Sequence, residues 1–483
     1  MSLIPRKISN FDEVLFQFIK GREGHSRTVY ADTKGIPTIG YGYAMVIKSG
    51  GVWKVRDKLE DQLDKSLDIT LQESDITRLN QIVIALNDTI TPNDNVSQAQ
   101  ALVGNTKADG NSNFNLTFPN GEADGRKLYD YIINDYKNEV RKRIGDALYN
   151  NLDGSNEMVA LVSMAYNGPS LIDTDIVKAL ANGNRAEAWF EIRYKSNTNN
   201  SSGAANRRYK EAGMFGLYNA GGTTEENAKE VMRMWTIHQK EMEEYERTYP
   251  PSSANSSSRF TNINNARLYL IQNFGEGRDA IITKVIVGEG LDSYAYKDGI
   301  PDDNKLEGSI NTDIIFGEAG DDKIYAYNGN DIIYGGDGAD EIYGGYGEDI
   351  LNGGAGSNIL NGGTEYDIYK IVSKDGGENI IQDEDGDGSV MFDGAVLGGG
   401  TNANTVSTIY YTDGVNTYEW DGHNGSDLII NGTTRVEDFY NTKLGINLTD
   451  EKGGNNDKPP TDSTPPGSPP GGGGGTGGGS GGG

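Results

Sequence analysis

The chain of 483 residues contains no cysteine and only three histidines. The absence of cysteine excludes disulfide bonds, thiolate metal sites and a cysteine nucleophile. His25, His238 and His423 lie far apart in the sequence and do not have the spacing of metal ligands. We therefore expect each histidine to be structural or solvated rather than catalytic.

Long apolar runs are also missing. No stretch of about 18 apolar residues occurs, so we expect no segment that spans a membrane. Residues 1–7 lack the apolar core and the cleavage site of a signal peptide. If the protein leaves the cell, we expect it to use a route that needs no cleaved N-terminal signal.

Positive charge is scarce in the second half of the chain. Residues 1–250 carry 30 basic and 34 acidic side chains, whereas residues 251–483 carry 13 and 37. A surface this acidic repels nucleic acid and anionic lipid and favours cations. The chain is too long for one compact core, so we expect two or three domains, with a different role for the acidic half.

A helix followed by a small hairpin is predicted near the N-terminus. Apolar residues at helical spacing precede Gly24, which can end the helix: Phe11, Val14, Leu15, Phe18 and Ile19. Residues 28–30 and 38–41 are typical of two short strands, and a turn joins them. This arrangement puts Glu23 at the helix end and Asp32 in the turn.

Two carboxylates in these positions suit the cleavage of a glycosidic bond. One protonated carboxyl donates a proton to the leaving oxygen, while an ionised carboxylate activates water or attacks as a nucleophile. Glu23 and Asp32 supply the pair, and the hydroxyl of Thr38 can hold the water because it both donates and accepts hydrogen bonds. A surface hairpin with solvated charges is the alternative, since two acids at this spacing are common.

The whole stretch closely resembles the catalytic motif of the phage-type lysozymes. The matching residues are Glu23, Gly24, Tyr30, Asp32, Gly35, Thr38, Ile39, Gly40 and Gly42. The resemblance implies an α+β lysozyme-like domain that cuts the β-1,4 bond between N-acetylmuramic acid and N-acetylglucosamine in peptidoglycan, with inversion. It assigns the general acid to Glu23 and the orientation of water to Asp32 and Thr38. One departure is Tyr43, where many members have histidine.

This resemblance covers about residues 1–248. Residues 53–87 are predicted to be helical, and the polar residues 88–122 are interpreted as a long loop or insertion. Further helices are predicted at 127–148, 158–169 and 224–248. The composition of residues 249–258 indicates a linker.

Two later segments also resemble the family. Tyr166 and Asn167 end the buried helix, and the resemblance implies that they contact substrate; core packing and a helix cap explain them equally well. Residues 205–211 resemble an Arg-Arg-x-x-Glu motif. Its expected role is arginine–carboxylate pairing, ahead of substrate binding by Arg207.

A strict nine-residue repeat follows residue 307. Each glycine-rich loop ends in an aspartate, once replaced by Asn358, and an apolar residue follows two positions later. The candidate metal ligands are Asp313, Asp322, Asp331, Asp340, Asp349 and Asp367. The pattern closely resembles the RTX (repeat-in-toxin) calcium repeat.

These residue types suit a calcium-bound parallel β-roll over residues 308–370. Glycines with positive φ let carbonyl oxygens point at an ion, and calcium takes about six to eight oxygen ligands. Each unit can bury its apolar residue only against its neighbours. Aspartates two units apart should face the same ion: Asp322 with Asp340, and Asp331 with Asp349. The site at Asn358 should be weaker because it loses a charge.

Repulsion among these carboxylates predicts that the roll is disordered at cytosolic calcium levels and folds outside the cell. The resemblance implies the same, because RTX proteins are commonly exported unfolded by type I secretion machinery. We therefore expect a secreted, extracellular protein.

The segments around the roll are less well defined. Residues 259–307 are mixed in composition and have no pattern that predicts one fold. Residues 371–452 form a β-rich flank, in which residues 404–448 predict strands that cap the roll. Residues 383–388 contain the first half of an EF-hand loop, interpreted first as a solvated turn and second as a calcium site. The Pro- and Gly-rich residues 453–483 are interpreted as a disordered tail.

Together these observations predict a secreted bacterial lysozyme with a calcium-dependent RTX module. The expected partners are peptidoglycan, calcium ions and the type I secretion machinery, but not nucleic acid. One alternative is a calcium-dependent surface or adhesion protein whose lysozyme-like domain only binds glycan; the intact Glu23, Asp32 and Thr38 argue against it. The other is a phage endolysin, which a roll that needs extracellular calcium disfavours.

Overall fold

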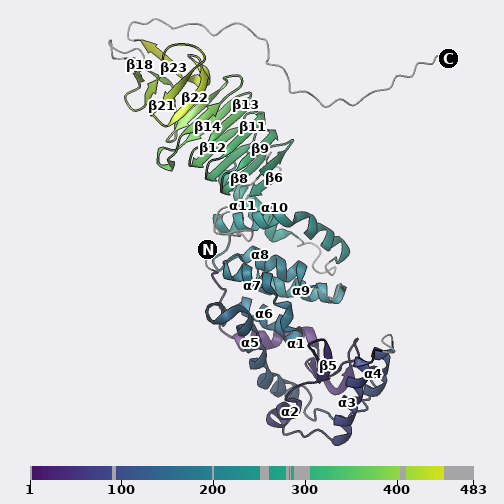
Figure 1. Cartoon of the computed structure of the whole chain (residues 1–483). Helices are drawn as coiled ribbons and strands as arrows, with labels where there is room; N and C mark the ends of the chain where they lie inside the picture. Colours follow the sequence, from purple (N-terminus) through teal and green to yellow (C-terminus); the bar gives the residue numbers. More distant parts are fainter. Residues whose placement is uncertain are drawn as a thin grey trace, which may run out of the picture. The chain divides into compact units, whose positions relative to one another are not determined.

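The computed structural model describes residues 3–89, 94–197, 201–250, 260–278, 282, 284–287, 305–402 and 410–450. The chain folds as two units, Met1–Asp322 and Lys323–Gly483 (Figure 1). The predicted tail at 453–483 and most of the predicted linker lie outside the described residues. Within the described part of the chain, no helix is long and apolar enough to cross a membrane.

The first unit begins with the predicted helix and hairpin. Its elements are α1 (Phe11–Glu23), β1 (Ser26–Ala31), β2 (Pro37–Gly40) and β3 (Tyr43–Ala44). Gly24, with a φ of 66°, ends the helix in a conformation that side chains disfavour. β1 and β2 are antiparallel with Tyr30 opposite Thr38, which confirms the predicted hairpin.

The next segment differs from the prediction of one helix over residues 53–87. It contains β4 (Val46–Ser49), β5 (Val52–Val55), α2 (Leu59–Leu67) and α3 (Glu73–Asn87). Lys58 and Asp68 adopt left-handed backbone conformations with φ of 62° and 57°, and they bound α2 on both sides. The apolar spacing alone did not reveal these two breaks.

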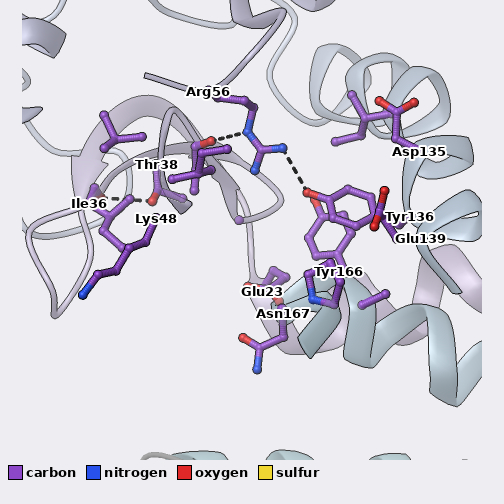
Figure 2. Close-up of a pocket in the computed structure, with 18 of the residues that line it drawn as sticks. Glu23, Ile36, Thr38, Lys48, Arg56, Asp135, Tyr136, Glu139, Tyr166 and Asn167 are labelled. Carbon is purple, nitrogen blue, oxygen red and sulfur yellow. Dashed lines mark hydrogen bonds between the residues drawn. The ribbon is translucent and has the colours of Figure 1, made fainter. Parts of the chain in front are cut away.

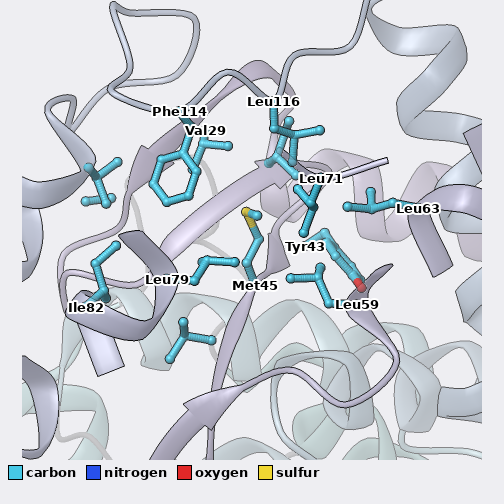
Figure 3. Close-up of a cluster of buried hydrophobic side chains, with 14 of the residues drawn as sticks. Val29, Tyr43, Met45, Leu59, Leu63, Leu71, Leu79, Ile82, Phe114 and Leu116 are labelled. Carbon is cyan, nitrogen blue, oxygen red and sulfur yellow. The ribbon is translucent and has the colours of Figure 1, made fainter. Parts of the chain in front are cut away.

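Residues 88–122, interpreted as a loop or insertion, are partly structured. Their described residues include α4 (Asn95–Val103), and Phe114 and Leu116 belong to the core. Figure 3 shows both side chains in the same buried cluster as Val29 from β1 and Leu79 from α3. The segment therefore completes the hydrophobic core under the hairpin, which its polar composition concealed.

A larger helical region follows. Its helices are α5 (Glu122–Leu152), α6 (Asn156–Asn167), η1 (Pro169–Leu171), α7 (Thr174–Ala181), α8 (Arg185–Phe190), η2 (Glu191–Lys195), α9 (Ser202–Phe215), α10 (Glu225–Thr248) and α11 (Thr261–Phe274). The predicted helices at 127–148, 158–169 and 224–248 correspond to α5, α6 and α10. Gly145 interrupts α5 with non-helical angles, φ 82° and ψ 162°.

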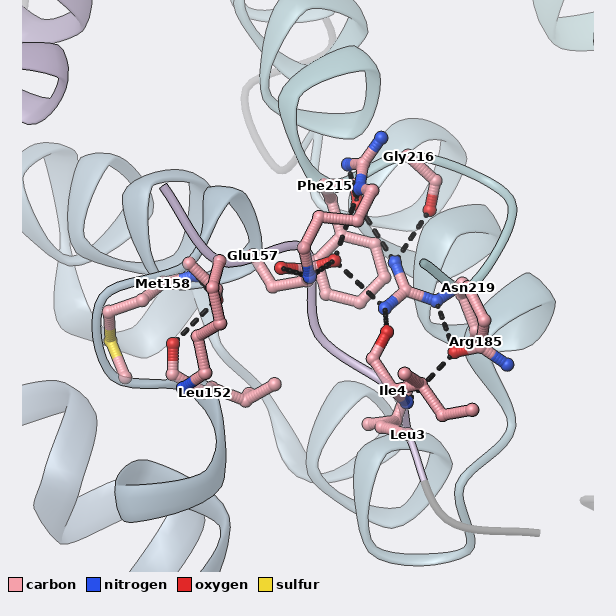
Figure 4. A network of polar contacts seen from close by, with 12 residues as sticks. Leu3, Ile4, Leu152, Glu157, Met158, Arg185, Phe215, Gly216 and Asn219 are labelled. Atoms are coloured by element: carbon pink, nitrogen blue, oxygen red, sulfur yellow. Dashed lines mark hydrogen bonds and ion pairs between the residues drawn. The ribbon is translucent and has the colours of Figure 1, made fainter. Parts of the chain in front are cut away.

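A buried ion pair joins the helices of this region (Figure 4). Arg185 Nη2 lies 2.8 Å from Glu157 Oε1, and both side chains are fully buried. The same guanidinium donates to the backbone oxygens of Ile4 and Phe215 at 3.2 and 3.0 Å. The N-terminal segment is thus fixed to α6, α8 and α9 at one point.

The first unit ends with short strands. They are β6 (Lys284–Val287), β7 (Lys305–Ser309) and β8 (Asp313–Ala319). β6 pairs with β8 in parallel. The described part of the unassigned region 259–307 is therefore α11 and strands that lead into the repeats.

The second unit contains a parallel β-solenoid. Its strands are β9 (Lys323–Asn328), β10 (Ile332–Asp337), β11 (Glu341–Tyr346), β12 (Ile350–Ala355), β13 (Ile359–Thr364) and β14 (Asp367–Ile371). Ile333 lies opposite Leu351, and Ile342 opposite Leu360, which are 18 positions apart. All four side chains are fully buried. Two nine-residue repeats therefore make one turn, as expected for a β-roll.

After β14 each turn lengthens. Ile359 pairs with Ile380, and Ile368 with Ser389, which are 21 positions apart. The following strands are β15 (Asn379–Gln382), β16 (Gly388–Phe392), β17 (Ala395–Val396), β18 (Gly399–Asn402), β19 (Tyr410–Thr412), β20 (Thr417–Glu419), β21 (Ser426–Ile430), β22 (Thr434–Phe439) and β23 (Asn447–Asp450). Strands β19 to β22 are antiparallel neighbours, and β22 pairs with β15. Strands thus cover the end of the roll, as predicted, although residues 403–409 lie outside the described residues.

Candidate functional site

A cleft of about 1660 Å³ opens in the first unit (Figure 2). The hairpin, the loops around β4 and β5, α5, the end of α6 and the start of α9 contribute to its walls. The five residues predicted as catalytic or substrate-binding all line it: Glu23, Asp32, Thr38, Tyr166 and Asn167. Residues up to 144 positions apart in sequence therefore meet at one site.

Glu23 is held at the end of α1 by two neighbours. Its side chain is 18% exposed, and its Oε1 forms an ion pair with Arg207 Nη2. A Cβ atom at Gly42, whose φ is 72°, would overlap with the Glu23 carboxylate. The glycine of the motif thus leaves room for the acid, and Arg207 fixes its direction.

Asp32 and Thr38 are oriented by the turn between β1 and β2. Asp32 Oδ1 accepts hydrogen bonds from the backbone N–H groups of Lys34 and Ile36, both at 2.8 Å. The hydroxyl of Thr38 donates to the Ile36 carbonyl at 3.1 Å, so its oxygen can still accept a hydrogen bond from water. The turn therefore presents a carboxylate and a hydroxyl oxygen on the same cleft wall.

The charges of both acids affect the pKa of Tyr30. Burial raises the pKa of its phenol, and the Glu23 and Asp32 carboxylates raise it further. Both carboxylates therefore act on one side chain of β1. This part of the cleft favours positive charge.

Tyr166 and Asn167, both at the end of α6, have different roles. Tyr166 donates to the backbone oxygen of Tyr41 at 2.7 Å, and its ring lies 4.6 Å from the ring of Tyr136. Burial raises the pKa of Tyr166 well above its usual value. Tyr166 thus packs α6 against the hairpin, whereas Asn167 is exposed at the cleft.

Arg207 belongs to the Arg-Arg-x-x-Glu segment, and its observed partners are carboxylates. Its Nε lies 3.5 Å from Glu211 Oε1, while its Nη2 contacts Glu23. Glu211 is fully buried and also pairs with Arg208 at 3.0 Å and with the hydroxyl of Ser163 at 2.6 Å. Burial opposes the charge of Arg207, but the Glu23 and Glu211 carboxylates outweigh it and raise its pKa.

Sequence reasoning missed two other residues of the cleft. Arg56 donates to the Ala44 carbonyl at 2.6 Å and to the hydroxyl of Tyr136 at 3.3 Å (Figure 2). Arg56 and Tyr136 are 80 positions apart, and no local pattern marks either. They join the hairpin side of the cleft to α5.

The repeat aspartates occupy equivalent places in the roll. Asp313, Asp331, Asp349 and Asp367 are fully buried, and Asp322 and Asp340 are at most 2% exposed. The backbone N–H of Asp331 donates to Asp349 Oδ1 at 2.7 Å, and that of Asp349 to Asp367 Oδ1 at 2.8 Å. The predicted partners Asp331 and Asp349 thus meet one turn apart. Asp322 ends the first unit, so its predicted pairing with Asp340 stays a prediction.

The loops fit an oxygen-liganded ion. A Cβ atom at Gly335 would overlap with Asp340 Oδ2 and the Gly353 carbonyl oxygen, and one at Gly344 with Asp349 Oδ2 and the Gly362 oxygen. One carboxylate and backbone carbonyls therefore converge at each loop, which is the donor set that calcium prefers. The described residues bring no three His, Cys or acidic side chains together as a metal site.

The acidic turn at 383–388 is held by hydrogen bonds within the protein. Asp385 accepts hydrogen bonds from the N–H groups of Glu365 and Asp387 at 2.8 and 2.9 Å. Asp383 accepts one from the hydroxyl of Tyr369 at 2.7 Å. These contacts favour the interpretation as a turn over that as a calcium site, but Asp383 is buried and not solvated.

A comparison with protein-family models matches residues 307–342 and 334–369 to the RTX calcium-binding nonapeptide repeat (4 copies). Repeats of this family bind calcium ions in a β-roll and are typical of proteins secreted by type I systems. A search of curated proteins found no match to the chain. The chain thus carries RTX-type repeats at the position of the observed solenoid.

Proposed function

We propose that the first unit is a lysozyme that hydrolyses the β-1,4 bond between N-acetylmuramic acid and N-acetylglucosamine in peptidoglycan. The observation that carries the proposal is the shared cleft of Glu23, Asp32 and Thr38. Small-molecule pockets span about 300–1,000 Å³. A cleft of about 1660 Å³ with open surroundings suits a segment of a polymer better.

In this proposal Glu23 donates a proton to the leaving oxygen. Asp32 and the oxygen of Thr38 orient the attacking water, and the negative charge of Asp32 stabilises the oxocarbenium-like transition state. Arg207 keeps the Glu23 side chain against the cleft wall through its ion pair. Asn167 and Arg56 are the candidate hydrogen-bond donors to the sugar, since both line the cleft.

The second unit gives this enzyme its calcium dependence and its place of action. RTX-type repeats whose aspartates and carbonyls converge need the ion to balance buried negative charge. Cytosolic calcium is too low for this, so the turns with stacked aspartates fold after export. The proposed protein is therefore a secreted bacterial enzyme that acts on cell walls outside the producing cell.

The test is the release of reducing sugar ends from purified peptidoglycan in millimolar calcium, by the wild type and by Glu23→Gln. Loss of a general acid lowers the rate by about 10²–10⁴-fold, and we expect a loss in this range. Glu13→Gln is the matched control, because Glu13 lies on the same helix and is exposed.

Each outcome separates the candidates. Equal activity of wild type and Glu23→Gln would overturn the role of Glu23. Sedimentation of all three proteins with peptidoglycan, without release of reducing ends, would favour the calcium-dependent surface protein that only binds glycan.

A further inference from the structure

Asn358 takes the place of the aspartate in one repeat and is fully buried. Its Oδ1 accepts a hydrogen bond from the backbone N–H of Asp340 at 3.0 Å. Asp349 Oδ1 accepts the same bond from the N–H of Asp331 at 2.7 Å. One half of the side chain thus repeats the contact that the aspartates make.

The amide nitrogen of Asn358, by contrast, has no counterpart in the aspartates. Its Nδ2 donates to the carbonyl oxygens of Gly354 at 3.3 Å and Gly356 at 3.4 Å, and to Asn379 Oδ1 at 3.0 Å. A Cβ atom at Gly353 would overlap with this Nδ2, whereas one at Gly344 would overlap with Asp349 Oδ2. At the same place in the loop, an N–H donor therefore replaces a carboxylate oxygen.

The neighbours of Asn358 determine which way the amide points. A flipped amide would bring its NH₂ group against the N–H of Asp340 and its oxygen against the Gly354 and Gly356 carbonyls. Both contacts would join like partners, donor to donor and acceptor to acceptor. The orientation with Nδ2 toward the glycine carbonyls is the one that satisfies every group.

The residues stacked beyond Asn358, in the row that follows β13, β15 and β22, are also uncharged. The pairing of Ile359 with Ile380 and of Ile380 with Arg435 aligns Asn358, Asn379 and Thr434. All three are at most 6% exposed. On the other edge, by contrast, Asp331, Asp349 and Asp367 continue the row of carboxylates.

We propose that the Asn358 amide is a built-in substitute for calcium. Its N–H groups bind the carbonyl oxygens that would otherwise face an ion, and their partial positive charge excludes the ion from this loop. The edge from Asn358 onward is then held by hydrogen bonds alone and forms at low calcium. β13 and β15 then form a folded edge, on which the calcium-dependent turns can assemble. The proposal concerns calcium binding only and does not depend on lysozyme activity.

The test is the number of calcium ions bound by the full chain, counted by native mass spectrometry in wild type and Asn358→Asp. We expect the variant to bind one additional ion and to need more calcium for folding. Asn361→Asp, an equal change on the same strand at a half-buried position, should bind the wild-type number. An unchanged count in Asn358→Asp would overturn the proposal.

A measurement on the wild type covers the case in which Asn358→Asp does not fold. In the calcium-loaded chain, the side-chain NH₂ protons of Asn358 should exchange slowly with solvent by NMR, because both are hydrogen-bonded and buried. Fast exchange of these protons would mean that the amide does not bind the glycine carbonyls, and would overturn the proposal.

Discussion

The two units compensate buried negative charge in different ways. In the first unit, three buried glutamates have arginine partners: Glu157 with Arg185, Glu211 with Arg208, and Glu246 with Arg193. In the repeats, buried aspartates follow one another at intervals of a turn and receive backbone N–H groups. The first arrangement is complete within the chain, whereas the second leaves net negative charge for a cation. The first unit should therefore fold alone, whereas the turns in which aspartates stack should fold only with calcium.

Removal of calcium should have the largest effect and should separate the two units. With a chelator, we expect hydrogen–deuterium exchange protection to collapse in β10, β12 and β14, where the aspartates stack, while α5 and α6 stay protected. The reason is that only the roll loses a ligand that stabilises its folded state. Equal protection of β10, β12 and β14 with and without calcium would contradict the comparison.

Breaking an arginine partnership should affect the first unit alone. Arg185→Ala leaves Glu157 buried beside only Arg6, and loss of one partner of a buried ion pair costs about 3–5 kcal/mol. Chemical denaturation in calcium, followed by the helical circular dichroism signal, measures this loss. Lys65→Ala, which removes an exposed pair with Asp61, is the control and should change little. A similarly small change for Arg185→Ala would show that the ion pair is not required.

Glu191 differs from the three glutamates that have arginine partners, because neighbouring carboxylates add to the effect of its burial. Burial raises its pKa to about 8, and Glu187, Asp173 and Asp175 add to the effect. The folded state therefore holds a proton that the unfolded chain releases near its ordinary pKa of about 4.3. Stability from this group is complete at low pH and is lost as the pH rises from about 4 to about 8, by roughly 5 kcal/mol.

Glu191→Gln should remove this part of the pH dependence. We expect the variant to be more stable than wild type at pH 8 and similar at pH 5, in thermal unfolding in calcium. Glu244→Gln, at an exposed position of α10, should keep the wild-type profile. A wild-type profile in Glu191→Gln would contradict the assignment.

The smallest effect is expected for an ion pair on the surface of the roll. Lys323 and Glu341 form a pair on neighbouring strands, but both are more than 40% exposed. Such pairs contribute little because water screens them. Lys323→Gln should therefore shift the calcium midpoint of folding by less than about twofold. A larger shift, measured by circular dichroism against calcium concentration, would mean that surface charge and not the loops controls assembly.

Local patterns in the sequence sufficed where neighbours in the chain are also neighbours in space. The nine-residue period determined the roll, its inward side chains and the stacking of Asp331 on Asp349, because each turn repeats the last. The apolar spacing before Gly24 and the turn after β1 likewise determined α1 and the hairpin. The apolar spacing wrongly predicted one helix at residues 53–87, where two residues with left-handed backbone conformations bound α2.

The candidate site likewise combines a local sequence motif with contacts that only the fold creates. The sequence alone brought Glu23, Asp32 and Thr38 into one motif, since they lie within 16 positions of one another. Only the tertiary structure decided that Arg207 pairs with Glu23 across 184 positions, and that Arg56 reaches Tyr136. It also decided that the Asn358 amide points its nitrogen at the glycine carbonyls. Such choices depend on which groups packing brings within hydrogen-bond distance, and residue types along the chain do not encode that distance.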